Sequence, residues 1–139
     1  MKVLTLLPLP QLYAICRLEC LKPLLEDAVS QQAQFGPLYA LSVTADEISL
    51  ICTQDKAEAL QPLCGGQFDF GWKAFRLAGT FAFDQVGILA GISTVLAQAE
   101  VGIMAVSTFD TDYILVKQEN WDKARQAVIA AGYAWGEEK

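Results

Sequence analysis

The order of hydrophobic patterns between residues 72 and 132 is the feature that most constrains the fold of this chain. It predicts a strand, a turn with aspartate and glycine, an amphipathic helix, two strands joined by a tight turn, and a second helix. Strands and helices in this order pack as a sheet covered by helices. The segment therefore predicts a small α/β sandwich in which the first helix begins across the end of a strand.

The first helix of this segment carries one apolar stripe over about fifteen residues. Asp84 is a good N-cap, because its carboxylate can accept a hydrogen bond from a free amide of the first turn. Gly87 and Gly91 each weaken a helix by about 1 kcal/mol relative to alanine. We expect close packing of the helix on the sheet, or a ligand against the backbone, to explain them. The stripe consists of Ile88, Leu89, Ile92, Val95, Leu96 and Ala99.

The two strands that follow, residues 101–108 and 112–117, are apolar on both faces. A sheet with one face in water would alternate apolar and polar residues instead. We therefore expect the second face to be covered as well, by the other half of the chain or by a partner subunit. Asn120 caps a last helix, and residues 133–135 are a candidate closing strand.

The N-terminal half gives a weaker version of the same pattern. It predicts a strand over residues 12–18, a helix with Pro23 in its first turn, and a hairpin over residues 39–53. Residues 56–63 then form at most two helical turns, and the glycines that follow indicate a boundary. The predicted domains are residues 1–68, a degenerate unit, and residues 69–139.

The two halves resemble each other in sequence. Residues 42–51 align, with one gap, with residues 106–116, which indicates a duplication of βαββαβ units about 65 residues apart. The first copy is eroded in its second helix in this interpretation. The predicted fold class is α/β (α+β), a ferredoxin-like sandwich of two tandem units.

Composition excludes several functional classes. The 139 residues carry a net charge of −6 and no histidine, which argues against nucleic acid and anionic membrane surfaces as partners. No imidazole is present to activate a nucleophile or bind a metal. The high hydrophobic content, 53%, favours burial between units or against a second copy of the chain.

Pro8 and Pro10 interrupt the apolar N-terminal run, so we predict a cytoplasmic protein rather than an exported one. The cysteines lack paired Cys-x-x-Cys spacing and are read as small buried residues of a reducing cytosol. A zinc site of four thiolates and a disulfide pair are the alternatives. The cysteines are Cys16, Cys20, Cys52 and Cys64.

The predicted corner has the groups that a free amino acid needs. Amides of Val86, Gly87 and Ile88 at the helix start would attract its carboxylate. Its ammonium group would donate hydrogen bonds to Asp112 and to carbonyls near Thr108. Simpler roles remain open: Asp112 as a turn residue, Thr108 as a locally bonded strand residue, and Phe109 as a core or interface residue instead of a cover over the site.

Two motifs resemble the ACT domain: Phe83-Asp84-x-x-Gly87-Ile88 and Ser107-Thr108-Phe109-x-x-Asp112. More narrowly they resemble the CASTOR arginine sensors and their small bacterial relatives, over residues 72–132. The resemblance implies a ligand held between ACT units. It places Gln85, Val86 and Gly87 on the loop side, and Thr108, Phe109 and Asp112 on the strand side. The arginine sensors have a glutamate where this chain has Gln85, and four ACT units, so the resemblance implies a dimer and leaves the ligand open.

Together these observations predict a non-catalytic regulatory protein that binds a free amino acid, without cofactor or metal. The remaining acidic residues lie in caps and turns, where no acid/base pair forms. The alternatives are an interaction or dimerisation module that docks on a partner protein without a ligand, and an enzyme on a ferredoxin-like scaffold.

Overall fold

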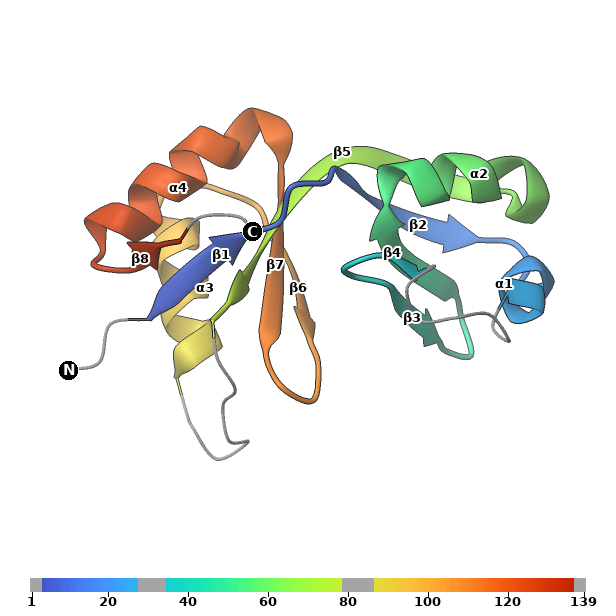
Figure 1. Ribbon diagram of the computed structural model, residues 1–139, viewed down its shortest axis with the longest axis horizontal. Coiled ribbons are helices and arrows are strands. Elements are labelled where there is room, and N and C mark those ends of the chain that lie inside the picture. Colours follow the sequence, from blue (N-terminus) through green and yellow to red (C-terminus); the bar gives the residue numbers. More distant parts are fainter. Residues whose placement is uncertain (1–3, 28–34, 79–86, 137–139) are drawn as a thin grey trace. The chain divides into compact units, whose positions relative to one another are not determined.

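The computed structural model describes residues 4–27, 35–78 and 87–136 (Figure 1). The chain forms two compact units. The first unit consists of residues 11–72, and the second unit consists of residues 1–10 together with residues 73–139. No helix in the described ranges is long and apolar enough to cross a membrane.

The first unit is a βαββαβ fold. Its strands follow the order β3-β4-β2-β5, and all neighbouring pairs are antiparallel. The elements are β2 (Tyr13–Leu18), α1 (Lys22–Asp27), β3 (Ala40–Val43), β4 (Ile48–Thr53), α2 (Gln54–Cys64) and the first part of β5 (Gly66–Leu77).

The second unit repeats this arrangement and begins with the end of β5. Its strands follow the order β6-β7-β5-β1-β8. The added strand β1 (Thr5–Pro8) pairs antiparallel with β5 and parallel with β8. The remaining elements are α3 (Ile88–Gln98), β6 (Met104–Ser107), β7 (Asp112–Lys117), the short helix η2 (Gln118–Asn120), α4 (Trp121–Ala130) and β8 (Ala134–Trp135).

This division differs from the predicted boundary at residue 68, which falls inside β5. The beginning of β5 pairs with β2, where Gly66 faces Leu18, and its end pairs with β1, where Leu77 faces Leu6. One strand therefore serves both units. The glycines at the predicted boundary have another role, because a Cβ at Gly66 would lie 2.0 Å from the carbonyl oxygen of Arg17. Glycine here allows β5 to approach β2 closely.

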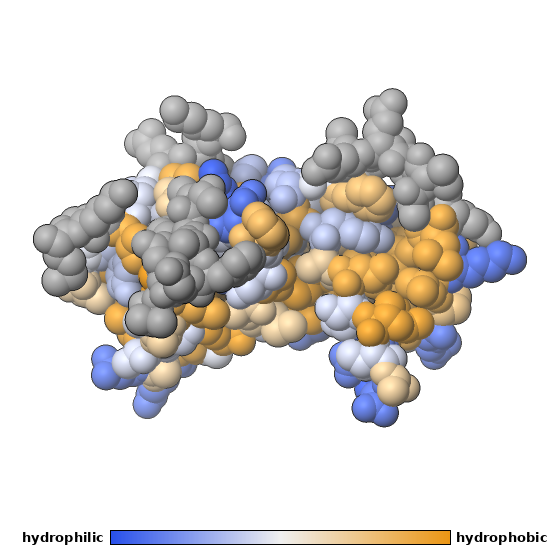
Figure 2. Space-filling view, turned by 90° about the horizontal axis from the view of Figure 1, so that it is seen from below, coloured by the Kyte–Doolittle hydropathy of each residue, from blue (hydrophilic) through white to orange (hydrophobic). Residues whose placement is uncertain are grey.

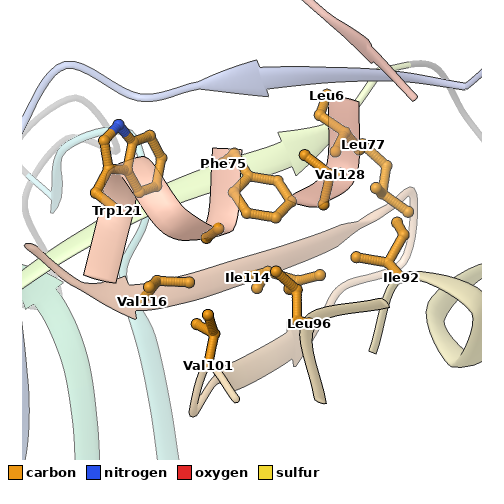
Figure 3. Close-up of a cluster of buried hydrophobic side chains, with 11 residues drawn as sticks. Leu6, Phe75, Leu77, Ile92, Leu96, Val101, Ile114, Val116, Trp121 and Val128 are labelled. Atoms are coloured by element: carbon orange, nitrogen blue, oxygen red, sulfur yellow. The ribbon is translucent and has the colours of Figure 1, made fainter. Parts of the chain in front are cut away.

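The core of the second unit confirms the predicted apolar stripe. Ile92 and Leu96 of α3 are fully buried, and the other residues of the stripe pack against the same cluster. Figure 3 shows Phe75 of β5 between Trp121 and Val128 of α4. The helix itself is shorter than predicted: it begins at Ile88, and the predicted cap Asp84 lies outside the described residues.

The core of the first unit corrects the prediction of an eroded second helix. Helix α2 has 11 residues, and Ala57, Leu60 and Cys64 form its buried face. These positions follow helical spacing. The helix begins at Gln54, two residues before the segment that the sequence predicted to be helical. The other buried residues of this core are Ala14, Cys16, Leu18, Leu24, Leu50 and Cys52.

The hairpins of the two units match without the predicted gap. The last pair before the turn is Val43 with Ile48 in the first unit and Ser107 with Asp112 in the second, and corresponding residues are 64 positions apart. Strands β4 and β7 also share the same burial pattern. The duplication is therefore visible at the level of single residues in this part of the chain.

The expectation that the second face of the sheet is covered holds at Leu115. Ile114 and Val116 of β7 belong to the core on the helix side. Leu115 lies between them and points to the opposite face, because side chains alternate along a strand. It is nevertheless fully buried.

Candidate functional site

The predicted site lies at one end of the second unit. The end of β5, the beginning of α3 and the turn between β6 and β7 all lie toward this end, which is lower in Figure 1. Thr111 in the turn donates a hydrogen bond of 2.9 Å from its hydroxyl to the carbonyl oxygen of Leu77. This bond attaches the turn to the end of β5.

Gly87 starts helix α3 from a left-handed backbone conformation, with φ of 83° and ψ of −2°. Residues with a Cβ rarely adopt this conformation, which explains the glycine. A Cβ at Gly87 would meet no atom of the described residues within 4 Å, its chain neighbours aside. Ile88 follows, and its half-buried side chain packs against the core.

Gly91 has a different explanation. A Cβ at this position would lie 3.1 Å from the hydroxyl oxygen of Tyr133. The glycine thus allows α3 to pack closely against the segment that leads into β8. Of the two explanations offered for the glycines, close packing accounts for Gly91, whereas Gly87 is required by its backbone conformation.

Thr108 organises the turn between β6 and β7. Its backbone N–H donates to the carbonyl oxygen of Thr111 at 2.8 Å, and its hydroxyl donates to the same oxygen at 3.0 Å. The N–H of Thr111 donates back to the hydroxyl oxygen of Thr108 at 3.3 Å. The predicted local role of Thr108 is therefore confirmed. These hydrogen bonds between Thr108 and Thr111 fix the backbone of the turn.

Asp112 begins β7 and is half-buried. Ser107, its partner across the hairpin, donates a hydrogen bond from its hydroxyl to Oδ1 of Asp112 at 2.5 Å. The carboxylate is thus oriented by the last pair of the hairpin. Ser107 was not among the predicted site residues. The sequence contained a signal for this contact. Ser107 and Asp112 are polar residues that flank a four-residue turn, and the register of a hairpin places two such residues opposite each other.

Phe109 lies at the tip of the turn and is 80% exposed. It is therefore not a core residue of the second unit. Of the large hydrophobic side chains in the described residues, Phe109 is the most exposed.

The structure thus brings Thr108, Phe109 and Asp112 together on one hairpin and places Gly87 and Ile88 at the same end of the unit. The remaining two predicted residues, Gln85 and Val86, lie outside the described residues. In the part of the chain that the structure describes, no three acidic or cysteine side chains are grouped so as to hold a metal ion.

Comparison with known proteins shows a family similarity for part of this chain. A family model described as ACT domain matches residues 67–129, which run from the beginning of β5 into α4. This region is therefore similar to the ACT domain, and the predicted ferredoxin-like fold is confirmed. The narrower resemblance to the arginine sensors stays a prediction.

Solved structures show the same fold. A crystal structure of a protein from Agobacterium tumefaciens is 28% identical, covers 100% of this chain and 96% of that chain, and has a TM-score of 0.77. Aspartate kinase from Synechocystis is 19% identical over 99% of this chain and 28% of that chain, with a TM-score of 0.74. The regulatory subunit of aspartate kinase from Thermus flavus is 16% identical over 94% of this chain and 99% of that chain, with a TM-score of 0.65.

Proposed function

We propose that this protein is a non-catalytic regulatory protein that binds a free amino acid through the second unit. The observation that carries the proposal is the polar pair at the end of the β6–β7 hairpin. Ser107 orients the carboxylate of Asp112 beside a turn that is closed by threonine hydrogen bonds. The ACT domain match over residues 67–129 and the regulatory subunits among the similar structures support a regulatory role.

The ligand would be bound by its two charged groups. Its ammonium group would donate to the carboxylate of Asp112 and to backbone carbonyls near Thr108. Its carboxylate would accept hydrogen bonds from backbone amides where α3 begins, at Gly87 and Ile88 and in the preceding residues Gln85 and Val86. Gly87 supports such an approach, because no atom of the described residues beyond its chain neighbours lies within 4 Å of the position of its missing Cβ.

The arrangement proposed for the whole protein follows the family resemblance. The amino acid would lie at an interface between ACT units, in a cytoplasmic homodimer that rebuilds the four units of the arginine sensors. Gln85 stands where the arginine sensors have a glutamate, so the negative charge at this position is lost. The proposed ligand is therefore not restricted to arginine.

A second candidate is an interaction module that works without a ligand. The exposed ring of Phe109 favours it, and so do exposed apolar side chains on the first unit. Figure 2 shows a hydrophobic patch on that unit, on the right of the view. Among the described residues of the first unit, the exposed large hydrophobic side chains are Leu25, Leu41, Val43 and Leu63.

A thermal-shift screen of all proteinogenic amino acids at millimolar concentration tests the first proposal. A ligand at one hundred times its Kd stabilises the folded state by about 2.7 kcal/mol. For a chain of this size the melting temperature should rise by several degrees. A flat response to every amino acid, together with one stoichiometric partner in a pulldown, would favour the interaction module instead.

The matched variants are Asp112→Asn and Asp110→Asn. Both remove one negative charge from the same hairpin, and Asp112→Asn retains an oxygen that can accept the hydrogen bond from Ser107. The proposal expects Asp112→Asn to lose the ligand response, while Asp110→Asn retains it. Equal responses of both variants would show that Asp112 does not contact the ligand.

A further inference from the structure

The four cysteines of this chain gather in the first unit. Cys16, Cys52 and Cys64 are buried in its core, and Cys20 is exposed at the edge. Cys20 lies two residues after β2, whereas Cys64 is the last residue of α2, and Gly65 separates it from β5. The two cysteines are 44 positions apart in the sequence, and the fold brings them together.

The pairing of β2 with β5 ends close to both cysteines. Its last pair is Leu18 with Gly66, so Cys20 lies two residues beyond the end of β2, and Cys64 lies two residues before Gly66, at the end of α2. The end of this strand pair therefore directs both cysteines toward the same region of the first unit.

Side-chain contacts confirm this proximity. The thiol of Cys20 donates weak hydrogen bonds to the carbonyl oxygens of Cys64 at 3.6 Å and Leu63 at 3.7 Å. The carboxylate of Glu19 lies close to Gly65, the residue after Cys64. A Cβ at Gly65 would be 2.7 Å from Oε2 of Glu19. Carbonyls at a helix end lack partners within the helix, so these bonds hold Cys20 at the end of α2.

The other pair of thiols is unsuited to a disulfide. Cys16 faces Leu50 and Cys52 faces Ala14, so these two cysteines are diagonal neighbours on adjacent strands. Diagonal Cα atoms are about 7–8 Å apart, which is too far for a disulfide without movement of the backbone. Both side chains are buried. The hydrogen bond with Cys16 and burial also raise the pKa of Cys52, which keeps it a thiol.

We infer that Cys20 and Cys64 form a reversible disulfide, so that the first unit carries a redox-responsive bond between the end of β2 and the end of α2. Cys20, being exposed, reacts first. Cys64 is only 2% exposed and reacts through its neighbour. Burial raises the pKa of Cys64, and the thiol of Cys20 adds to this increase, so its reaction is faster at higher pH.

With glutathione disulfide as the oxidant, the reaction has two steps. The thiolate of Cys20 attacks one sulfur, forms a mixed disulfide with one glutathione and releases the other as a thiolate. The thiolate of Cys64 then attacks the sulfur of Cys20 and releases the second glutathione. Two protein thiols are oxidised, one glutathione disulfide is reduced to two glutathione molecules, and these take up the two protons that the protein loses.

The test is to equilibrate the full chain with glutathione buffers of increasing oxidising ratio, block free thiols with an alkylating agent and map disulfides by mass spectrometry. Cleavage after Glu, Lys and Arg separates all four cysteines, because Arg17, Glu47 and Lys56 lie between them. The expected product is a Cys20–Cys64 link that reverses in reduced glutathione. A stable mixed disulfide at Cys20, or links that include Cys16 or Cys52, would overturn the inference.

Cys20→Ser and Cys52→Ala are the matched variants. Cys20→Ser should abolish the link, and Cys52→Ala should leave its yield unchanged. The oxidised protein should melt several degrees higher than the reduced one without reductant, because the bond restricts the unfolded chain. Cys20→Ser should show no such shift. An oxidised protein that melts lower than the reduced one would show that the two thiols are not held in bonding position.

Discussion

The two hairpins of this protein have the same backbone and different chemistry. In both, a threonine at the first turn position holds the turn: Thr44 bonds Glu47 in the first unit, and Thr108 bonds Thr111 in the second. The pair of residues that closes the turn is apolar in the first unit, Val43 with Ile48, and polar in the second, Ser107 with Asp112.

The different closing pairs show which features of the hairpin the fold requires and which features occur only in the second unit. The threonine bonds and the burial pattern are common to both hairpins, so they belong to the architecture. The polar pair is not required to close the turn, because the first unit closes its turn with valine and isoleucine. We propose that the carboxylate held by a serine hydroxyl at this position serves ligand binding.

The largest expected effect tests whether the two cores are equivalent. Leu50→Ala and Ile114→Ala remove side chains at corresponding positions of β4 and β7, both fully buried. Each should lower the free energy of unfolding by about 3 kcal/mol, since both leave cavities in packed cores. Urea denaturation measures the loss. A loss below about 1 kcal/mol in one variant alone would show that the units are not packed alike.

The second prediction converts one hairpin into the other. The double variant Ser107→Val with Asp112→Ile gives the second unit the closing pair of the first. Without ligand its stability should change by less than about 1 kcal/mol, because both hydrogen-bond partners are replaced together. The response to an amino acid, about 2.7 kcal/mol at one hundred times Kd, should disappear. Thermal melts with and without ligand measure both quantities. A retained response would locate the ligand elsewhere.

The third prediction concerns the threonines that hold the turns. Thr44→Val and Thr108→Val each remove the side-chain hydrogen bonds of one turn. Each should cost about 1 kcal/mol, the usual net contribution of such bonds. Chemical denaturation of both variants should give similar losses. A much larger loss for Thr108→Val would indicate that its turn supports more than its own hairpin.

The smallest effect is expected for Phe109→Ala, which gives the second turn the residue found at Ala45 in the first. The ring is 80% exposed, so stability should change by less than about 0.5 kcal/mol. Binding of an amino acid or of a partner protein should weaken if the ring covers the ligand or forms the contact. A large loss of stability without ligand would assign Phe109 to the fold instead.

Much of the fold could be predicted from the sequence because periodicity records burial. The stripe of α3, the strand over β2 and the repeated hairpin all appear as local patterns. The same patterns predicted Thr108 as a locally bonded residue. They placed the helix start near Gly87, but the reason for that glycine came only with its left-handed backbone conformation.

The tertiary structure decided what depends on distant residues. The pairing of β1 with β5 and β8 moves the first residues of the chain into the second unit, and β5 serves both units. Gly66 beside Arg17 and Gly91 beside Tyr133 are explained only by close approach across the fold. The meeting of Cys20 and Cys64 is another example. Local patterns determine which face of an element is buried, whereas strand neighbours and close approaches follow from how all elements pack, which no short segment encodes.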